Sequence, residues 1–145
     1  MRYYLLILLI GLGTDAQAQT FLDWSDLSDG ISYRALSLED PFPGFSKATF
    51  SEKLAVLEGK EVILTGYFLV LDGNQSLHML SKNPMASCFF CGNGGPETVA
   101  GLQFQEEPSF TTDDLLSVKG ILRLNRDNPN QYYYRIEKAD AIRLK

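Results

Sequence analysis

The arrangement of apolar residues from Glu61 to Leu71 is the feature that most constrains the fold of this chain. The even positions Val62, Leu64, Phe68 and Val70 are apolar, whereas Glu61, Thr65 and Tyr67 at odd positions are more polar. This pattern predicts a half-buried strand, because successive side chains of a strand point to opposite faces of the sheet. Gly66 falls within the segment and predicts a bulge or a sharp bend there.

Four further segments show the same kind of strand pattern: residues 76–80, 100–104, 116–125 and a bent fifth segment within 131–144. Asp72-Gly73-Asn74 separates the first two strands and is typical of a hairpin turn. Five short strands with a glycine-bent first strand predict an all-β fold, a small five-stranded barrel of the OB type. An open β-sandwich is the alternative, because the number of strands does not show whether the sheet closes.

The chain before these strands is less regular. We expect residues 19–46 to form an extended N-terminal segment and residues 47–145 to form the barrel domain. The prolines in Pro41-Phe42-Pro43-Gly44-Phe45 prevent regular helix or central strand at that point. One short helix is expected after it, capped by Thr49 or Ser51 and ended by Gly59.

Residues 1–18 have the pattern of a secretory signal peptide. Arg2 precedes an apolar run, and Ala16-Gln17-Ala18 offers an Ala-x-Ala cleavage site. The run is shorter than the roughly 20 residues that span a bilayer. We therefore expect cleavage after Ala18, a chain that begins at Gln19 in the periplasm or outside the cell, and no transmembrane segment after removal of the leader.

The net charge of −5 argues against nucleic acid as a partner. Proteins that bind nucleic acid usually neutralise phosphates with a broad positive surface, which an acidic chain lacks. An envelope protein or a small ligand is the expected partner.

Both cysteines of the chain, Cys88 and Cys91, lie in one loop that is rich in glycine. The loop continues through Gly92, Gly94, Gly95 and Pro96. Disulfides form and persist in exported proteins, and two cysteines at this spacing can approach bonding distance. A structural disulfide is therefore the first expectation, although closing so short a loop adds only modest stability.

A metal site is the second interpretation of the same loop. Two thiolates suit zinc or copper(I), but tetrahedral zinc needs four ligands and there is no second pair of cysteines. His78, the only histidine in the sequence, and Glu97 are the candidate additional ligands. The sequence leaves the disulfide and the metal site open and makes no cofactor certain.

Thiol–disulfide exchange through Cys88 and Cys91 is the enzymatic alternative. A nucleophilic cysteine usually lies at a helix N-terminus or beside positive charge, and the glycines after Cys91 do not favour a following helix. No serine-nucleophile or phosphate-binding motif occurs in the sequence. We assign no catalytic residue and expect a non-catalytic protein.

A run of three tyrosines followed by arginine, residues 132–135, is the other candidate surface feature. Alternation within a strand would place Tyr133 and Arg135 on one face, and Tyr132 and Tyr134 on the other. Aromatic and arginine side chains together can form a stacking platform, so Tyr133 and Arg135 are its candidates. At least half of the run is expected to lie in the core.

Three groups of residues resemble a bacterial family of unknown function whose members are small exported proteins. They are Gly59-Lys60-Glu61-Val62 with Gly66-Tyr67, Cys88-Phe89-Phe90-Cys91-Gly92, and Gly95-Pro96-Glu97. The likeness extends from about Phe45 to the C-terminus and implies an exported β-domain of OB-like shape. Some relatives have a Cys-x-His arrangement where this chain has Cys-x-x-Cys. The resemblance implies no activity, so the expected function is that of an exported binding or accessory module.

Overall fold

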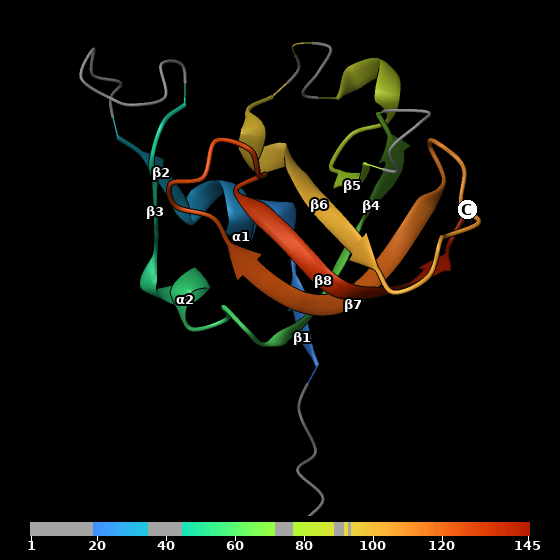
Figure 1. The fold of residues 1–145 in the computed structure, drawn as a ribbon, viewed down its shortest axis with the longest axis horizontal. Coiled ribbons are helices and arrows are strands. Elements are labelled where there is room, and N and C mark those ends of the chain that lie inside the picture. Colours follow the sequence, from blue (N-terminus) through green and yellow to red (C-terminus); the bar gives the residue numbers. More distant parts are fainter. Residues whose placement is uncertain (1–18, 35–44, 72–76, 89–91, 93) are drawn as a thin grey trace, which may run out of the picture.

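The computed structural model describes residues 19–34, 45–71, 77–88, 92 and 94–145 (Figure 1). Its elements are, in chain order, β1 (Thr20–Leu22), α1 (Trp24–Asp29), β2 (Ile31–Tyr33), β3 (Ala48–Phe50), α2 (Glu52–Ala55), β4 (Glu61–Val70), β5 (His78–Ser81), the 3-10 helices η1 (Met85–Ser87) and η3 (Pro96–Thr98), β6 (Val99–Phe104), β7 (Leu115–Leu124) and β8 (Tyr134–Arg143).

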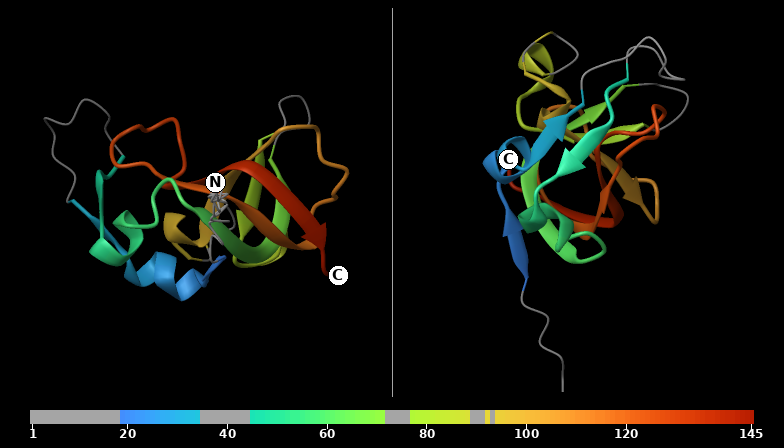
Figure 2. Two further views of the ribbon diagram at one scale, coloured as in Figure 1. Left: turned by 90° about the horizontal axis from the view of Figure 1, so that it is seen from below. Right: turned by 90° about the vertical axis from the view of Figure 1, so that its left-hand side faces the viewer.

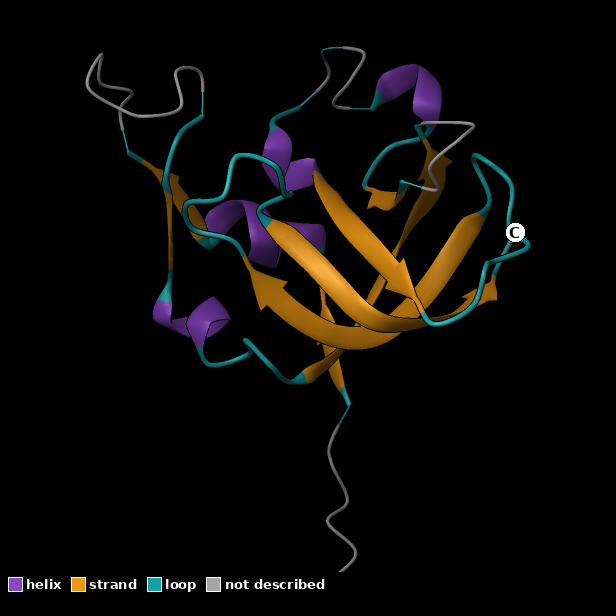
Figure 3. Cartoon of the chain, in the orientation of Figure 1, coloured by secondary structure: helices purple, strands orange, loops and turns teal. Residues whose placement is uncertain are grey.

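Strands β4 to β8 form a closed barrel in which the order is β4-β5-β6-β8-β7 and β7 pairs again with β4 (Figures 1 and 3). The β6–β8 pair is parallel, whereas the other pairs of the barrel are antiparallel. The prediction of a five-stranded barrel is therefore confirmed. The β4–β7 pairing, which joins residues 61–67 to residues 115–121, decides against the open sandwich.

The barrel interior is filled by the inward residues that alternation predicted for β4 and β7. On β4 the side chains of Val62, Leu64 and Phe68 are buried, and on β7 those of Val118 and Leu122 face them. Burying each such side chain contributes roughly 1.5–3 kcal/mol of hydrophobic free energy. These two strands therefore carry a large share of the core, which residues of β5, β6, β8 and the N-terminal elements complete.

Gly66 allows β4 to lie close to β5 and does not form the expected bulge. The register between β4 and β7 runs without a shift through Gly66. A Cβ atom at Gly66 would lie 2.6 Å from the carbonyl oxygen of Ser81 and 2.9 Å from Cγ of Leu80. The register shift of β7 against β8 instead lies between Lys119 and Ile121.

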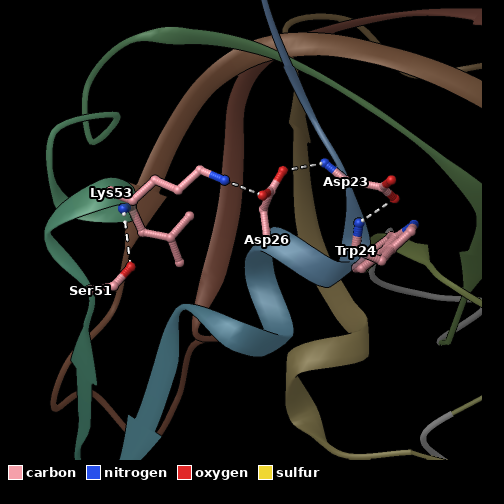
Figure 4. A network of polar contacts seen from close by, with 6 residues as sticks. Asp23, Trp24, Asp26, Ser51 and Lys53 are labelled. Atoms are coloured by element: carbon pink, nitrogen blue, oxygen red, sulfur yellow. Dashed lines mark hydrogen bonds and ion pairs between the residues drawn. The ribbon is translucent and has the colours of Figure 1, made fainter.

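The segment before the barrel is more regular than expected, because it contains helix α1 in addition to the predicted helix. Asp23 caps α1, and the carboxylate of Asp26 accepts a hydrogen bond from the backbone N–H of Asp23, which completes a capping box (Figure 4). Trp24 and Leu27 are buried from this helix. The indole N–H of Trp24 donates a 2.8 Å hydrogen bond to the carbonyl of Thr65 on β4.

Helix α2 lies where a short helix was predicted after the proline-rich stretch, but it ends at Ala55 and not at Gly59. Residues 41–44 of that stretch lie outside the described residues. Ser51 caps it by accepting a hydrogen bond from the backbone N–H of Leu54. The ion pair between Lys53 and Asp26 joins α2 to α1 (Figure 4). Strands β2 and β3 form a separate two-stranded sheet next to these helices (Figure 2).

Within the part of the chain that the structure describes, no helix has the length and apolar character needed to cross a membrane. The predicted leader lies outside that part.

Candidate functional site

A cleft of about 190 Å³ lies on the outer face of the barrel, where β5, β6 and β8 run side by side. Gly101 and Gln103 of β6 and Arg135 of β8 line it from the sheet, and residues 130–132 line it from the loop before β8. Loops held on a rigid sheet are common places for binding sites. We refer to this feature as the outer cleft.

The register of the strands explains why these side chains meet. Gly101 lies opposite Met79 of β5 on one side and Arg135 of β8 on the other, so the three residues share one face of the sheet. A Cβ atom at Gly101 would lie only 2.8 Å from Cδ2 of Tyr132. Glycine at this position therefore allows the ring of Tyr132 to lie directly against β6.

Tyr132 connects the outer cleft to the loop that contains Cys88. It lines the cleft and also packs against a small apolar cluster on the outside of the barrel, formed by Leu69, Met79, Cys88 and Val99. Burial raises the pKa of the Tyr132 hydroxyl, so this side chain stays neutral at physiological pH. Tyr132 therefore contacts both the cleft and the cluster that contains Cys88.

Arg135, which lines the cleft, and Arg123 share one carboxylate. Arg123 of β7 is directly opposite Arg135 of β8, and Glu137 follows two residues later on the same face. Nε of Arg123 donates a 2.9 Å hydrogen bond to Glu137, and Nη2 of Arg135 lies 3.3 Å from the other carboxylate oxygen. Nε of Arg135 is buried and has no hydrogen-bond partner among the described residues.

Cys88 carries a free thiol that has no exposed surface in the structure. Its sulfur lies 4.0 Å from the sulfur of Met85, within the apolar cluster that Tyr132 contacts. Cys91 lies outside the described residues, so a disulfide between the two cysteines stays a prediction. Of the loop glycines, Gly92 and Gly94 have positive φ values of 83° and 95°, which glycine adopts without strain.

His78 also lines the outer cleft, and its ring belongs to an aromatic group with Phe68 and Phe104. Its ring stacks on Phe68, with centroids 5.3 Å apart, and meets the edge of Phe104 at 5.8 Å. Its Nε2 lies 3.5 Å from the carboxylate of Glu107. Cys88 packs with Met79, and adjacent residues of a strand face opposite sides, so the structure does not bring His78 and Cys88 together.

Glu97, the other candidate metal ligand, bonds to Tyr33 and to the backbone of Gly95. Its carboxylate accepts hydrogen bonds from the Tyr33 hydroxyl at 2.9 Å and from the backbone N–H of Gly95 at 3.2 Å. Burial raises the pKa of Tyr33, and the nearby Glu97 carboxylate raises it further. Glu97 thus ties the loop that contains Gly95 and Pro96 to β2. Over the described residues, no three His, Cys, Asp or Glu side chains are grouped as metal ligands would be.

Tyr133 was predicted to form a surface platform with Arg135, but it is buried, so this part of the prediction is wrong. Tyr133 is only 7% exposed; its ring stacks on Phe45, and its hydroxyl donates to the carbonyl of Ser46. Strand β8 begins at Tyr134, so strand alternation does not apply to the residues before it. Tyr132, and not Tyr133, lines the outer cleft together with Arg135. The sequence feature that could have indicated this is Gly101 in the apolar strand β6, because a glycine there leaves room for a ring.

Comparison with solved structures finds a protein of similar fold. The chain is similar to a DUF3299 family protein from Pseudomonas aeruginosa PAO1, with a TM-score of 0.54 and 15% sequence identity over 88% of this chain and 99% of that chain. At this identity the similarity shows the fold alone. No protein-family model matches the sequence, and no curated protein matches it significantly.

Proposed function

We propose that the protein is an exported, non-catalytic binding or accessory module whose ligand binds in the outer cleft. The observation that carries this proposal is the ring of Tyr132, which lies against Gly101 beside Arg135 on the face of a rigid barrel. An aromatic ring next to a few converging polar groups is the usual composition of a small-ligand site. The ligand is an envelope protein or a small molecule, reached after removal of residues 1–18.

We further propose that Cys88 and Cys91 form a structural disulfide that fixes the loop behind Tyr132. Cys88 is free in the structure, so this bond is proposed for the protein after export and oxidation. The burial of Cys88 among apolar side chains argues against a reactive thiol, because reactive cysteines are partly exposed and lie beside positive charge. A zinc or copper(I) site that uses the two thiolates is the competing proposal. Among the described residues, His78 and Glu97 are not grouped with Cys88 as metal ligands would be.

The binding proposal predicts where ligands will perturb the protein. The ¹⁵N-labelled protein should be titrated with a panel of monosaccharides and N-acetyl amino-acid amides, with amide shifts followed by NMR. We expect the largest shifts at Gly101, Gln103 and Gln131. Gly101→Ala should weaken the same ligands about tenfold, because the added methyl group would displace Tyr132. Shifts centred away from β6 and β8 would contradict the proposal.

The disulfide proposal predicts the chemistry of the cysteines. Protein purified in air should have no titratable thiol after denaturation and should contain no stoichiometric zinc or copper by mass spectrometry. It should not accelerate the reduction of insulin by dithiothreitol. Cys88→Ala and Cys91→Ala should lower stability by similar amounts if both act through one bond. Turnover that depends on both cysteines would instead establish an oxidoreductase, and stoichiometric metal would establish the metal site.

A further inference from the structure

We propose that the outer cleft recognises a carboxylate group on a small polar ligand, and that Arg135 is the residue that binds it. This inference rests on the proposed binding function and specifies the chemistry of its ligand. It follows from the charge around Arg135, from the unsatisfied donor of its guanidinium, and from the polar groups along the cleft.

Two positive charges, Arg123 and Arg135, share the single carboxylate of Glu137, whereas Glu107 lies 3.5 Å from Nε2 of His78, which also lines the cleft. Arg123 and Arg135 are directly opposite in the β7–β8 pair, and like charges in that position are destabilising. Glu137 is the carboxylate that contacts both arginines, and its shorter contact is with Arg123. Arg135 is therefore only weakly neutralised, in a protein whose net charge is −5. A ligand carboxylate would relieve the repulsion.

The guanidinium of Arg135 also has hydrogen-bonding capacity that the described residues do not use. Its polar contact with Glu137 spans 3.3 Å, which is longer than the roughly 2.7–2.9 Å of a charge-assisted hydrogen bond. Its Nε is buried without a partner, and such a donor costs stability. Nε and an Nη atom together match the two oxygens of a carboxylate. Because Nε is buried, the Arg135 side chain must change rotamer before a ligand can reach this atom, and rotamer changes are common on binding.

The rest of the cleft suits a small ligand that has both polar and apolar groups. The amides of Gln103, Asn130 and Gln131 offer donors and acceptors, and Leu77, Leu102 and Tyr132 add apolar surface. The volume of about 190 Å³ is below the roughly 300–1,000 Å³ of pockets that hold drug-sized molecules. One acidic sugar or one acidic amino-acid residue would fit these limits, and both present the same carboxylate.

The experiment is a set of NMR titrations of the protein with matched probes. Glucuronate is compared with glucose, and N-acetylglutamate amide is compared with N-acetylglutamine amide, with inorganic phosphate as a further anion. We expect one carboxylate probe of the two to bind at least about tenfold more tightly than its neutral partner, and its binding to weaken as salt increases. The probe that binds identifies the source of the carboxylate.

Three substitutions assign the effect to Arg135. Arg135→Gln should weaken the carboxylate probe about tenfold, and Arg135→Lys should restore little, because lysine lacks the planar fork. Glu137→Gln should tighten binding about threefold by removing the competing carboxylate. Arg126→Gln is the matched control, since Arg126 pairs with Glu58 and does not line the cleft. It should leave binding unchanged.

The outcomes separate this inference from the proposed function. Equal binding of neutral and charged probes, with shifts at Gly101 and Gln103, would overturn carboxylate recognition but leave the binding function standing. Equal binding of phosphate, or no effect of Arg135→Gln, would also overturn it. If none of the probes shifts any amide at tens of millimolar, the carboxylate proposal is wrong.

Discussion

Replacing Tyr134 by alanine is expected to lower the free energy of unfolding by about 3–5 kcal/mol, as for other large aromatic side chains removed from a core. Tyr134 is fully buried at the start of β8, and its ring lies 5.7 Å from that of Phe50. Its hydroxyl donates a 2.8 Å hydrogen bond to the carbonyl of Leu27 in α1. One side chain thus joins the barrel, strand β3 and the N-terminal helix, and alanine would remove all three contacts.

Tyr134→Phe separates the hydrogen bond from the packing of the ring. It keeps the aromatic ring and leaves the Leu27 carbonyl without its donor, so we expect a loss of about 1–2 kcal/mol. Urea denaturation followed by circular dichroism would measure both variants. If alanine cost no more than phenylalanine, the ring would not be part of the core.

Trp24→Ala is expected to cost about 3–5 kcal/mol and to detach the N-terminal segment from the barrel. Trp24 is 7% exposed, packs close to Gly66 and donates its indole N–H to Thr65. It is the only tryptophan in the sequence, so the fluorescence of the unmodified protein reports this contact directly. We expect an emission maximum typical of a buried indole that shifts to the red on unfolding.

Two variants act as controls for Trp24→Ala. Trp24→Phe should cost less, because a ring still fills much of the space, although the hydrogen bond to Thr65 is lost. Phe21→Ala should change stability by less than about 0.5 kcal/mol, since Phe21 is 73% exposed on β1. Equal stabilities for Trp24→Ala and Phe21→Ala would show that residues 20–33 do not contribute to the folding unit.

The sequence alone determined the features that depend on local pattern. The alternation in β4 and β7 predicted which residues, such as Val62, Leu64 and Val118, point into the core. Ser51 and the apolar spacing after it predicted α2. These predictions succeeded because side-chain period and capping depend on residues that are close together in the chain. Helix α1 was missed, since its six residues are too short to show a periodic pattern.

Tertiary structure decided the features that depend on residues far apart in the sequence. The β4–β7 pairing closed the barrel, and no single segment carries information about that closure. The burial of Tyr133 and the exposure of Tyr132 to the cleft depend on where β8 begins and on a glycine in another strand, Gly101. The outer cleft exists because the strand register brings Gly101 beside Arg135, and register follows from packing of the whole core.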